Sequence, residues 1–402
     1  MRILVLNQFY VPDISPTAHL AESLIQDRVT RGDFVTVVTG HGSYVGVAGR
    51  VRKDVTNPRV CRIWTPGLGK ANLVHRLADY ASFYLGAAFL VLTLPRHDII
   101  VSMTTPPYIA LVGLIHKLLH PEAKLVLWNM DCYPEMFELA GVIRRGGITS
   151  RFLRWLNRRI FLRVDHLVCL DGAMASLLKV NYASGSVPPT SVLPNWESSD
   201  LYENPSARGA RSSKVLRILY LGNAGYGHEF DTLLAAAEML CNAPVEFAFC
   251  GGGSRFTALE KARNERGLMN LTLRGYIPKE DTAAVMREAD CALITLRRDA
   301  LGLMSPSKLH ANLAMGLPIL YVGPPGSNVD EAIKRFGCGF SIQNGDAAGL
   351  VAAIRGLLAE PEKLGKLGWK ARTAFEDAYS EAKVLPQFDV ILKGLDFSRA
   401  EG

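Results

Sequence analysis

The sequence of 402 residues lacks the cysteine patterns that mark several protein classes. Its seven cysteines are scattered and odd in number, and no two have the spacing of a zinc or redox motif. The first residues also lack the charged region, short apolar run and cleavage site of a secretory signal. We therefore expect reduced, mostly buried thiols and a cytosolic protein.

Long apolar runs are missing as well. The run at residues 80–92 is shorter than the about 20 apolar residues that a membrane-spanning helix needs. We expect this run to be buried against a sheet instead.

The chain carries a net charge of +7 at pH 7, and the excess lies in its first half. Residues 1–200 hold 21 Lys and Arg against 15 Asp and Glu, whereas the remainder holds 24 against 23. A basic half of this kind suits nucleic acid, anionic lipid or a phosphorylated substrate, and charge alone does not choose among them. No recognisable nucleic-acid motif accompanies the arginines, so we expect no nucleic-acid partner.

Short apolar strands alternate with helix-period segments in both halves of the chain. This alternation indicates parallel sheets covered by helices on both faces. Between the two series, residues 198–214 are rich in Ser, Arg, Gly and Asn and predict a linker. The expected strands are Ile3–Leu6, Val35–Val38, Ile99–Ser102, Leu125–Trp128 and Leu167–Leu170, then Leu216–Leu221, Val245–Cys250, Leu271–Leu273, Ala292–Leu296 and Pro318–Val322.

The predicted fold class is α/β, with two Rossmann-like domains whose parallel sheets face an interdomain cleft. We predict a first domain at residues 1–197, a linker at 198–214 and a second domain at 215–380. We expect the remaining segment, 381–402, to pack back on the first domain. Open parallel sheets bind ligands beyond the carboxyl ends of their strands, so residues that follow strands are the candidates for a site.

Two glycine clusters follow strands of the second half. The first strand runs into residues 222–228, with Gly222, Asn223 and Gly225, and the next strand ends at Gly251. Glycines permit close backbone approach, and a helix that starts there offers free N–H groups to a phosphate. A tight turn without a ligand explains the glycines about as well, because the spacing is not that of a dinucleotide-binding motif.

Ser305, Ser307 and Lys308 precede a predicted helix in the second half. Two hydroxyls and an ammonium at a helix start favour binding of an anion. The alternative is that one serine caps the helix and Lys308 is solvated.

A series of different short motifs lies at or after the predicted strands and extends along nearly the whole chain. They are FYVPD at 9–13, TPP at 105–107, DCYPE at 131–135, LPNW at 193–196, LYLGN at 219–223, GYIP at 275–278 and the stretch 305–318. Together they resemble the GT-B glycosyltransferases of family 4, especially the bacterial branch of exopolysaccharide, colanic acid and O-antigen synthesis.

This resemblance implies a retaining transferase in polysaccharide or glycoconjugate synthesis, with a UDP- or GDP-type sugar nucleotide as donor in the second domain. Lys308 and helix-end amides would then stabilise the departing phosphate. No Asp-x-Asp motif occurs, so we expect no metal and no cofactor. Adjacent arginines are usually solvated, which is the alternative for Arg298. The expected donor-binding residues are Gly222, Asn223, Gly225, Gly251, Tyr276, Ile277, Arg298, Ser305, Ser307, Lys308 and Asn312.

The chain departs from the family pattern at two positions. Many family 4 members carry two glutamates eight positions apart, where this chain has Leu303 and Ala311. Asn312 is adjacent and is our candidate to replace the second carboxylate. The missing glutamates favour one alternative function, a GT-B-like binding or partner subunit whose catalytic groups have decayed. A sugar-nucleotide epimerase of similar architecture fits the motifs less well.

In the first half, Asp131 follows a strand and is the candidate to orient the sugar or to take a proton from the acceptor hydroxyl. An aspartate that stabilises its own turn explains this position equally well. Ser15, Thr17 and His19 are the candidate acceptor contacts. A structural role at the start of a helix is the alternative for His19.

Residues 151–163 combine basic and aromatic residues on one predicted helix of the basic half. This pattern favours peripheral attachment to an anionic inner leaflet. The acceptor is then a glycan, a small molecule or a lipid-linked sugar, and attachment would bring the first domain to a lipid-linked one. The alternative is that these arginines pair with acids such as Glu135 and Glu138.

Overall fold

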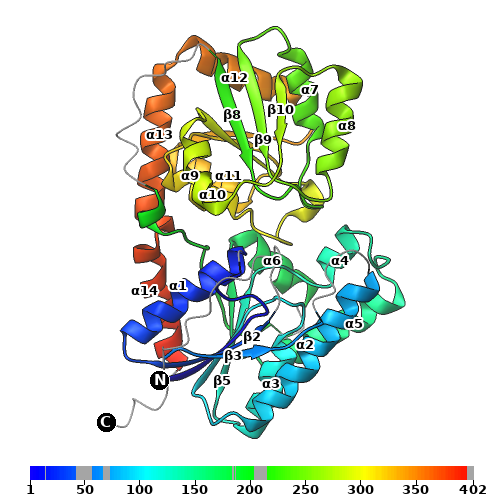
Figure 1. The fold of residues 1–402 in the computed structure, drawn as a ribbon, viewed down its shortest axis with the longest axis vertical. Coiled ribbons are helices and arrows are strands. Elements are labelled where there is room, and N and C mark those ends of the chain that lie inside the picture. The colour runs from blue at the N-terminus through cyan, green and yellow to red at the C-terminus, as the bar shows by residue number, and fades with distance from the viewer. Residues whose placement is uncertain are drawn as a thin grey trace.

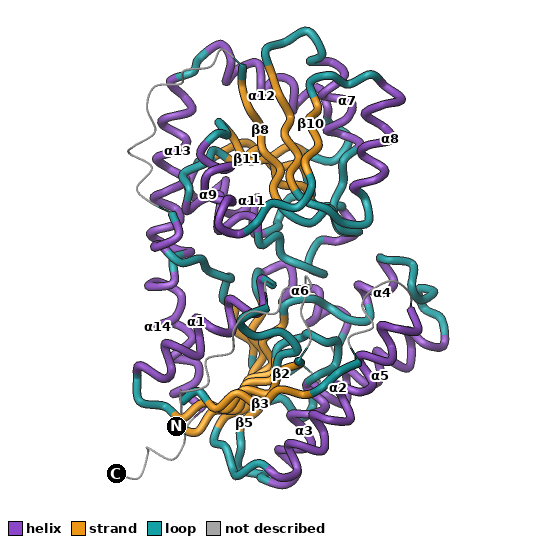
Figure 2. The backbone as a smooth tube through the Cα atoms, in the orientation of Figure 1, coloured by secondary structure: helices purple, strands orange, loops and turns teal. Residues whose placement is uncertain are grey.

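The computed structural model describes residues 1–13, 15–41, 57–66, 73–182, 185, 187–202 and 215–395. Two α/β bodies lie one above the other, and a run of helices at the C-terminal end joins them along one side (Figure 1). Each body has a central sheet flanked by helices, and loops lie where the two bodies face each other (Figure 2).

The first body is built on a seven-stranded sheet in which all pairs are parallel, in the order β3-β2-β1-β4-β5-β6-β7. Strand β1 is central, so Ile3 pairs with Val35 on one side and with Ile99 on the other. The strands are β1 (Arg2–Leu6), β2 (Phe34–Gly40), β3 (Arg59–Ile63), β4 (Ile99–Ser102), β5 (Lys124–Asn129), β6 (His166–Cys169) and β7 (Thr190–Val192).

Helices cover both faces of this sheet (Figure 1). Helices α1 (Pro16–Thr30) and α14 (Glu381–Leu395) lie together on one face. On the other face α3 (Ala110–Leu119) lies between α2 (Leu73–Thr93) and α5 (Ile148–Phe161). The short α4 (Glu135–Leu139) follows β5, and α6 (Gly172–Asn181) follows β6. None of the helices within the described residues is long and apolar enough to cross a membrane.

The second body has a six-stranded parallel sheet in the order β10-β9-β8-β11-β12-β13. Its strands are β8 (Leu216–Leu221), β9 (Val245–Cys250), β10 (Leu271–Arg274), β11 (Cys291–Thr295), β12 (Ile319–Val322) and β13 (Gly339–Ile342). Its helices are α7 (Asp231–Met239), α8 (Phe256–Arg266), α9 (Lys279–Arg287), α10 (Lys308–Ala314), α11 (Asn328–Phe336), α12 (Ala347–Ala359) and α13 (Glu362–Ala374).

These two parallel sheets confirm the predicted α/β fold class. The strands that the sequence pattern missed are β3, β7 and β13, each of which is an edge strand of its sheet. Their side chains are mostly half-buried or exposed, so they lack the continuous apolar run of a buried strand. Most of the predicted linker, residues 203–214, lies outside the described residues, and its described part holds a short 3-10 turn at Ser199–Leu201.

The C-terminal helix leaves the second body and returns to the first. A π-helical turn at Phe375–Tyr379 leads into α14, and Ser380 forms a parallel bridge with Glu197. Phe388 of α14 meets the ring of Trp128 edge-on, with ring centroids 5.0 Å apart. The buried Phe388 ring therefore belongs to the first core, although its residue lies at the far end of the chain.

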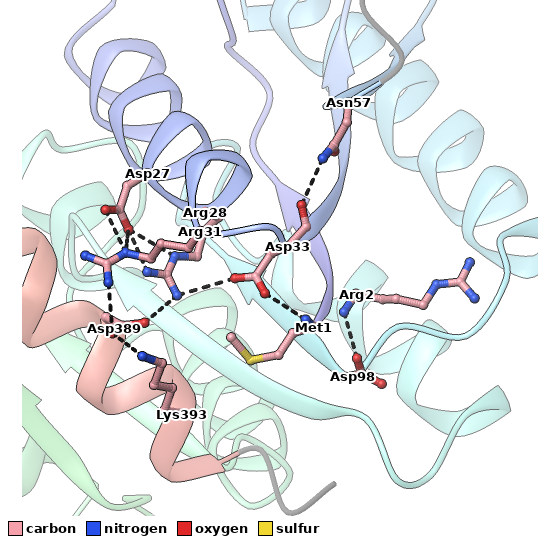
Figure 3. Close-up of polar contacts among 10 residues, drawn as sticks. All are labelled: Met1, Arg2, Asp27, Arg28, Arg31, Asp33, Asn57, Asp98, Asp389 and Lys393. Carbon is pink, nitrogen blue, oxygen red and sulfur yellow. Dashed lines mark hydrogen bonds and ion pairs between the residues drawn. The ribbon is translucent and has the colours of Figure 1, made fainter. Parts of the chain in front are cut away.

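Buried charges also tie α14 to the first body (Figure 3). The Arg28 guanidinium of α1 is only 1% exposed and lies 2.7 Å from the Asp389 carboxylate of α14. Asp27 and Asp33 lie 2.6 and 3.5 Å from the same guanidinium. The carboxylate of Asp389 also binds the more exposed Arg31. One buried cation thus holds several carboxylates together at the junction of α1 and α14.

Candidate active site

The carboxyl ends of the two sheets meet directly. Asp131, just after β5, forms an antiparallel bridge with Met304, which lies between β11 and α10. The Cys132 N–H donates to the Leu303 carbonyl at 2.8 Å. Asp171, just after β6, accepts from the Met174 N–H at the start of α6 and also hydrogen-bonds Ser305. Asp131 therefore lies beside the loop that leads into Lys308.

The two glycine clusters of the second body touch each other. Gly222 and Gly251 have φ angles of 117° and 144°, which side chains rarely adopt. A Cβ on Gly251 would lie 2.2 Å from the Gly222 carbonyl oxygen, and one on Gly222 would lie 3.2 Å from the Lys308 Cε. The protein's own backbone thus requires both glycines, whereas Gly225 has only an ordinary contact with the Asn223 side chain.

Lys308 is held at the glycine loop, so the alternative of a solvated lysine is wrong. It is half-buried, and its Nζ lies 3.2 Å from the Asn223 carbonyl oxygen and 3.2 Å from the His228 Nε2. The Tyr220 ring lies beneath the ammonium at 4.8 Å from its centroid. Burial lowers the pKa of Lys308 to about 7. No carboxylate pairs with this ammonium within the described part of the chain.

The two serines before Lys308 have different surroundings. Ser305 is buried and hydrogen-bonds Asp171 of the first body. Ser307 is exposed at the N-cap of α10, and its side chain makes no capping hydrogen bond. Helix capping by these serines is therefore not observed. Ser307 remains a predicted donor contact, whereas the contact of Ser305 joins the two bodies.

Asn312 does not present its amide as we expected of a substitute for the missing glutamate. It is 4% exposed, and its Nδ2 donates to the Lys308 carbonyl of its own helix at 2.8 Å. A carbonyl four residues back is the usual local partner for a short polar side chain within a helix. The adjacent Ala311 is half-buried against the second core.

Leu303 stands where the other family glutamate is common, and it has an apolar role. It is 6% exposed and belongs to the core of the first body, although it lies in the sequence of the second. The preceding Gly302 has a φ of 74°, and a Cβ there would lie 2.7 Å from the Ala173 carbonyl oxygen. This loop therefore docks on the first body through an apolar side chain and a close backbone approach.

The remaining donor candidates lie at three different places. Tyr276 is 58% exposed just beyond β10, and Ile277 is half-buried against the second core. Arg298 is exposed, and its Nη2 donates to the Asn344 carbonyl at 3.1 Å. It lines an open hollow of about 870 Å³ beside β13. The hydrogen bonds that Arg298 makes to described residues include none to Lys308 or to the residues that contact Lys308.

Ser15, Thr17 and His19 lie at the start of α1, beyond the carboxyl end of β1. Ser15 is the N-cap, and its Oγ accepts from the Ala18 N–H at 3.1 Å. The Ser15 and Thr17 hydroxyls are 3.3 Å apart, and His19 is half-buried. The capping bond explains Ser15 without an acceptor, and acceptor contacts by these three residues stay a prediction.

Asp131 presents a carboxylate rather than an Asx turn. The hydrogen bonds of Asp131 to described residues are made by its backbone, whose N–H donates to the Thr104 Oγ1 at 3.2 Å. Burial raises the pKa of its carboxyl to about 6. A carboxylate of this pKa is mainly ionised at neutral pH and is a stronger base than an ordinary aspartate.

Sequence reasoning missed His228, Asp171 and Tyr220. His228 is 3% exposed at the end of the glycine loop, and it binds Lys308 on one side and the Thr295 carbonyl on the other. Asp171 and Tyr220 belong to the same class of strand-end positions as the residues that we named. The position of His228 after the last glycine was the available signal. Its partner lies 80 residues away.

Comparisons with known proteins indicate the class of protein. Residues 203–374 match the family described as glycosyl transferases group 1. The chain is 28% identical to the "Probable glycosyltransferase WbjE" of Pseudomonas aeruginosa, over 82% of this chain and 83% of that protein. It is 24% identical to the "Putative colanic acid biosynthesis glycosyl transferase WcaI" of Escherichia coli, over 98% of this chain and 100% of that protein.

Solved structures with the same fold include two that match over nearly the whole chain. A sucrose-phosphate synthase from Thermosynechococcus elongatus has a TM-score of 0.76 at 14% identity, over 98% of this chain and 99% of that one. Alr3699/HepE of Anabaena, in complex with UDP and glucose, has a TM-score of 0.70 at 14% identity, over 98% and 100%. The chain therefore carries a glycosyl transferases group 1 domain on a GT-B fold and is a glycosyltransferase.

Proposed function

We propose that the enzyme transfers a sugar, with retention of configuration, from a UDP- or GDP-type donor to an acceptor in polysaccharide synthesis. The Lys308 ammonium at the glycine loop carries this proposal, since its neighbours in the described structure leave its positive charge uncompensated. A nucleoside diphosphate would supply the missing negative charge. The name of the relative WcaI refers to colanic acid synthesis. The structure of HepE, which has a similar fold, is a complex with UDP.

The proposed chemistry divides between the two bodies. On the donor side, Lys308 and the amides of the glycine loop stabilise the charge that develops on the leaving diphosphate. On the acceptor side, the Asp131 carboxylate orients the sugar or takes the acceptor proton. We propose that no metal takes part. The sequence contains no Asp-x-Asp motif, and the described residues hold no group of three or more His, Cys, Asp or Glu suited to a metal ion.

A panel of UDP- and GDP-sugars tests this function, with nucleotide release measured with and without lipid-linked and soluble acceptors. We expect release only when an acceptor is present. Hydrogen exchange on adding UDP or GDP should slow at residues 222–228 and 305–310. Binding without turnover on any acceptor would favour the decayed partner subunit. Unchanged exchange at saturating nucleotide would remove the proposed donor site.

We further propose that the acceptor is lipid-linked and that the first body attaches to an anionic membrane surface. Large apolar side chains of α5 point outward, with Ile148 89%, Phe152 57% and Trp155 51% exposed. They lie on one stripe of the helix at the spacing of one apolar face. The neighbouring helices of the same layer also expose apolar side chains, at Leu85, Phe89, Leu92, Leu118 and Leu119.

The arginines of α5 have two different roles. Arg154 turns inward, where its two Nη atoms lie 2.6 Å from Glu135 and 3.0 Å from Glu138. For this residue, pairing with acids is the correct interpretation. Three other arginines of α5 and Arg163, just after its end, are exposed and form no ion pair with any described residue. The three within α5 are Arg151, Arg158 and Arg159.

Replacing Arg151, Arg158 and Arg159 by glutamate should abolish sedimentation with liposomes and leave UDP binding intact. Wild-type binding should rise with phosphatidylglycerol content and fall with salt, because charge attraction is screened over about 10 Å at 0.1 M. The matched control changes three exposed lysines of the second body, Lys261, Lys366 and Lys370, to glutamate. This control has the same net charge and should still bind liposomes.

Equal loss of binding in both triple variants would mean that net charge alone governs attachment. Failure of the wild-type protein to bind anionic liposomes at low salt would show that α5 is no membrane anchor. The proposal of a lipid-linked acceptor would then lose this support.

A further inference from the structure

The surroundings of the Lys308 ammonium raise the question of what holds it in place. A partly buried cation is normally paired with a carboxylate. Here its neighbours are the Asn223 carbonyl, the His228 imidazole and the Tyr220 ring. None of them carries a negative charge, because burial raises the pKa of the Tyr220 hydroxyl and keeps it protonated. Of these three, only the imidazole is a side chain that accepts a hydrogen bond from the ammonium.

The protonation state of His228 follows from its second contact. Its Nδ1 lies 2.7 Å from the Thr295 carbonyl oxygen, which only accepts hydrogen bonds. The Nδ1 therefore carries the proton and donates it to that carbonyl, so Nε2 keeps its lone pair toward Lys308. Burial, followed by the charges of Lys308 and Arg255, lowers the pKa of His228 to about 3. The ring is neutral at physiological pH.

A neutral acceptor at this position has a specific consequence. A glutamate would hold the ammonium equally well, but it would cancel the positive charge and repel an incoming diphosphate. An apolar residue would leave the lysine without its side-chain partner. Histidine in this tautomer fixes the position of the Lys308 Nζ beside Gly222 and leaves the charge of the ammonium available to a ligand.

We propose that His228 is a positioning residue that holds the Lys308 ammonium at the glycine loop, uncompensated, for the phosphates of the donor. This inference rests on the proposed donor site. It adds to that site a residue that acts through Lys308 and does not itself contact the diphosphate. The Thr295 carbonyl at the end of β11 is part of the same arrangement, because it sets the tautomer.

Two variants of nearly equal shape test the proposal. His228→Gln keeps a neutral acceptor close to the position of Nε2, whereas His228→Glu places a carboxylate there. We expect the Kd for UDP, measured by calorimetry, to stay within about threefold of wild type in the Gln variant and to rise about tenfold or more in the Glu variant. In the Lys308→Met background this difference should shrink, because the cation that the carboxylate cancels is gone and only the direct repulsion between the carboxylate and the diphosphate remains.

A control separates positioning from loss of stability. His97→Gln changes another buried histidine, in the first body, whose Nε2 lies 3.1 Å from the Thr36 hydroxyl. It should lower the Tm without changing the Kd for UDP. The proposal is overturned if the Gln and Glu variants at position 228 bind UDP with equal Kd. It is also overturned if the difference in Kd between them is the same in the Lys308→Met background as in the wild type.

A measurement without ligand keeps the contact testable if the donor site itself is wrong. The pKa of Lys308, followed by NMR of ¹³C-labelled lysine, should rise in the Glu variant and change little in the Gln variant. If the pKa shifts in this way but the wild type binds neither UDP nor GDP, the donor function is refuted, and the contact between His228 and Lys308 still stands. No shift in the Glu variant would refute the contact itself, whatever the protein binds.

Discussion

Replacing Lys308 by alanine is expected to lower turnover roughly 10²-fold or more, because one preorganised electrostatic contact to a leaving group has an effect of that size. The fold should tolerate the change. The lysine pairs with no carboxylate among the described residues, so its removal leaves no buried acid uncompensated. Steady-state rates at saturating donor and acceptor, with the Tm measured beside them, check both parts.

The matched control is Arg298→Ala, which removes a cation from the hollow beside β13 rather than from the glycine loop. It should change turnover much less than Lys308→Ala. Wild-type kinetics in the Lys308 variant would remove this residue from the catalytic groups. An equal loss in both variants would mean that the donor site extends to the hollow.

The same lysine predicts how donor affinity depends on pH. Its pKa of about 7 means that the free enzyme loses the ammonium as the pH rises through 7. Donor binding needs the charged form, so affinity should fall above that pH in the wild type. In Lys308→Ala this loss should disappear.

Replacing Arg28 by methionine is expected to destabilise the first body by about 3 kcal/mol, the lower end of the usual result of removing one partner from a buried ion pair, because other cations still contact the same carboxylates. The side chain is 1% exposed, and its loss leaves Asp33 paired with the Met1 ammonium alone and Asp389 paired only with the more exposed Arg31 and Lys393. Because Asp389 lies on α14, the C-terminal helix should detach first. Urea unfolding and limited proteolysis near residues 381–395 measure the two effects.

Arg31→Met is the control, because Arg31 binds Asp27 and Asp389 but is 37% exposed. An exposed pair contributes about 1 kcal/mol or less, so this variant should unfold close to wild type. Equal stability of the two variants would show that the Arg28 cluster does not hold α14.

Much of the fold was predictable because it depends on local pattern. Buried parallel strands are continuous apolar runs, so β1, β2, β4, β5 and β6 could be recognised one by one. Strands at or near the sheet edges, such as β3 and β13, have side chains half in solvent and no such pattern. The class of site was also predictable, because strand ends in parallel sheets gather at one edge.

The roles of individual polar residues were less predictable. Asn312 and Arg154 each looked available for a ligand or a membrane, but both are occupied, by a backbone carbonyl and by two glutamates. Whether a polar group is occupied depends on partners brought close by folding, which the local sequence does not show. The same holds for Leu303, whose apolar side chain is explained only by its packing in the core of the first body.

The sequence by itself determined that this chain forms two parallel α/β bodies, that its chemistry lies beyond the strand ends, and that its basic surplus belongs to the first half. These properties follow from composition and short-range periodicity. The tertiary structure decided that Lys308 is held by a neutral histidine 80 residues away and that Asp131 pairs with the loop before α10. It also decided that α14 closes the first core. Charge, burial and hydrogen bonding are set by neighbours in space, and those neighbours are distant in the chain.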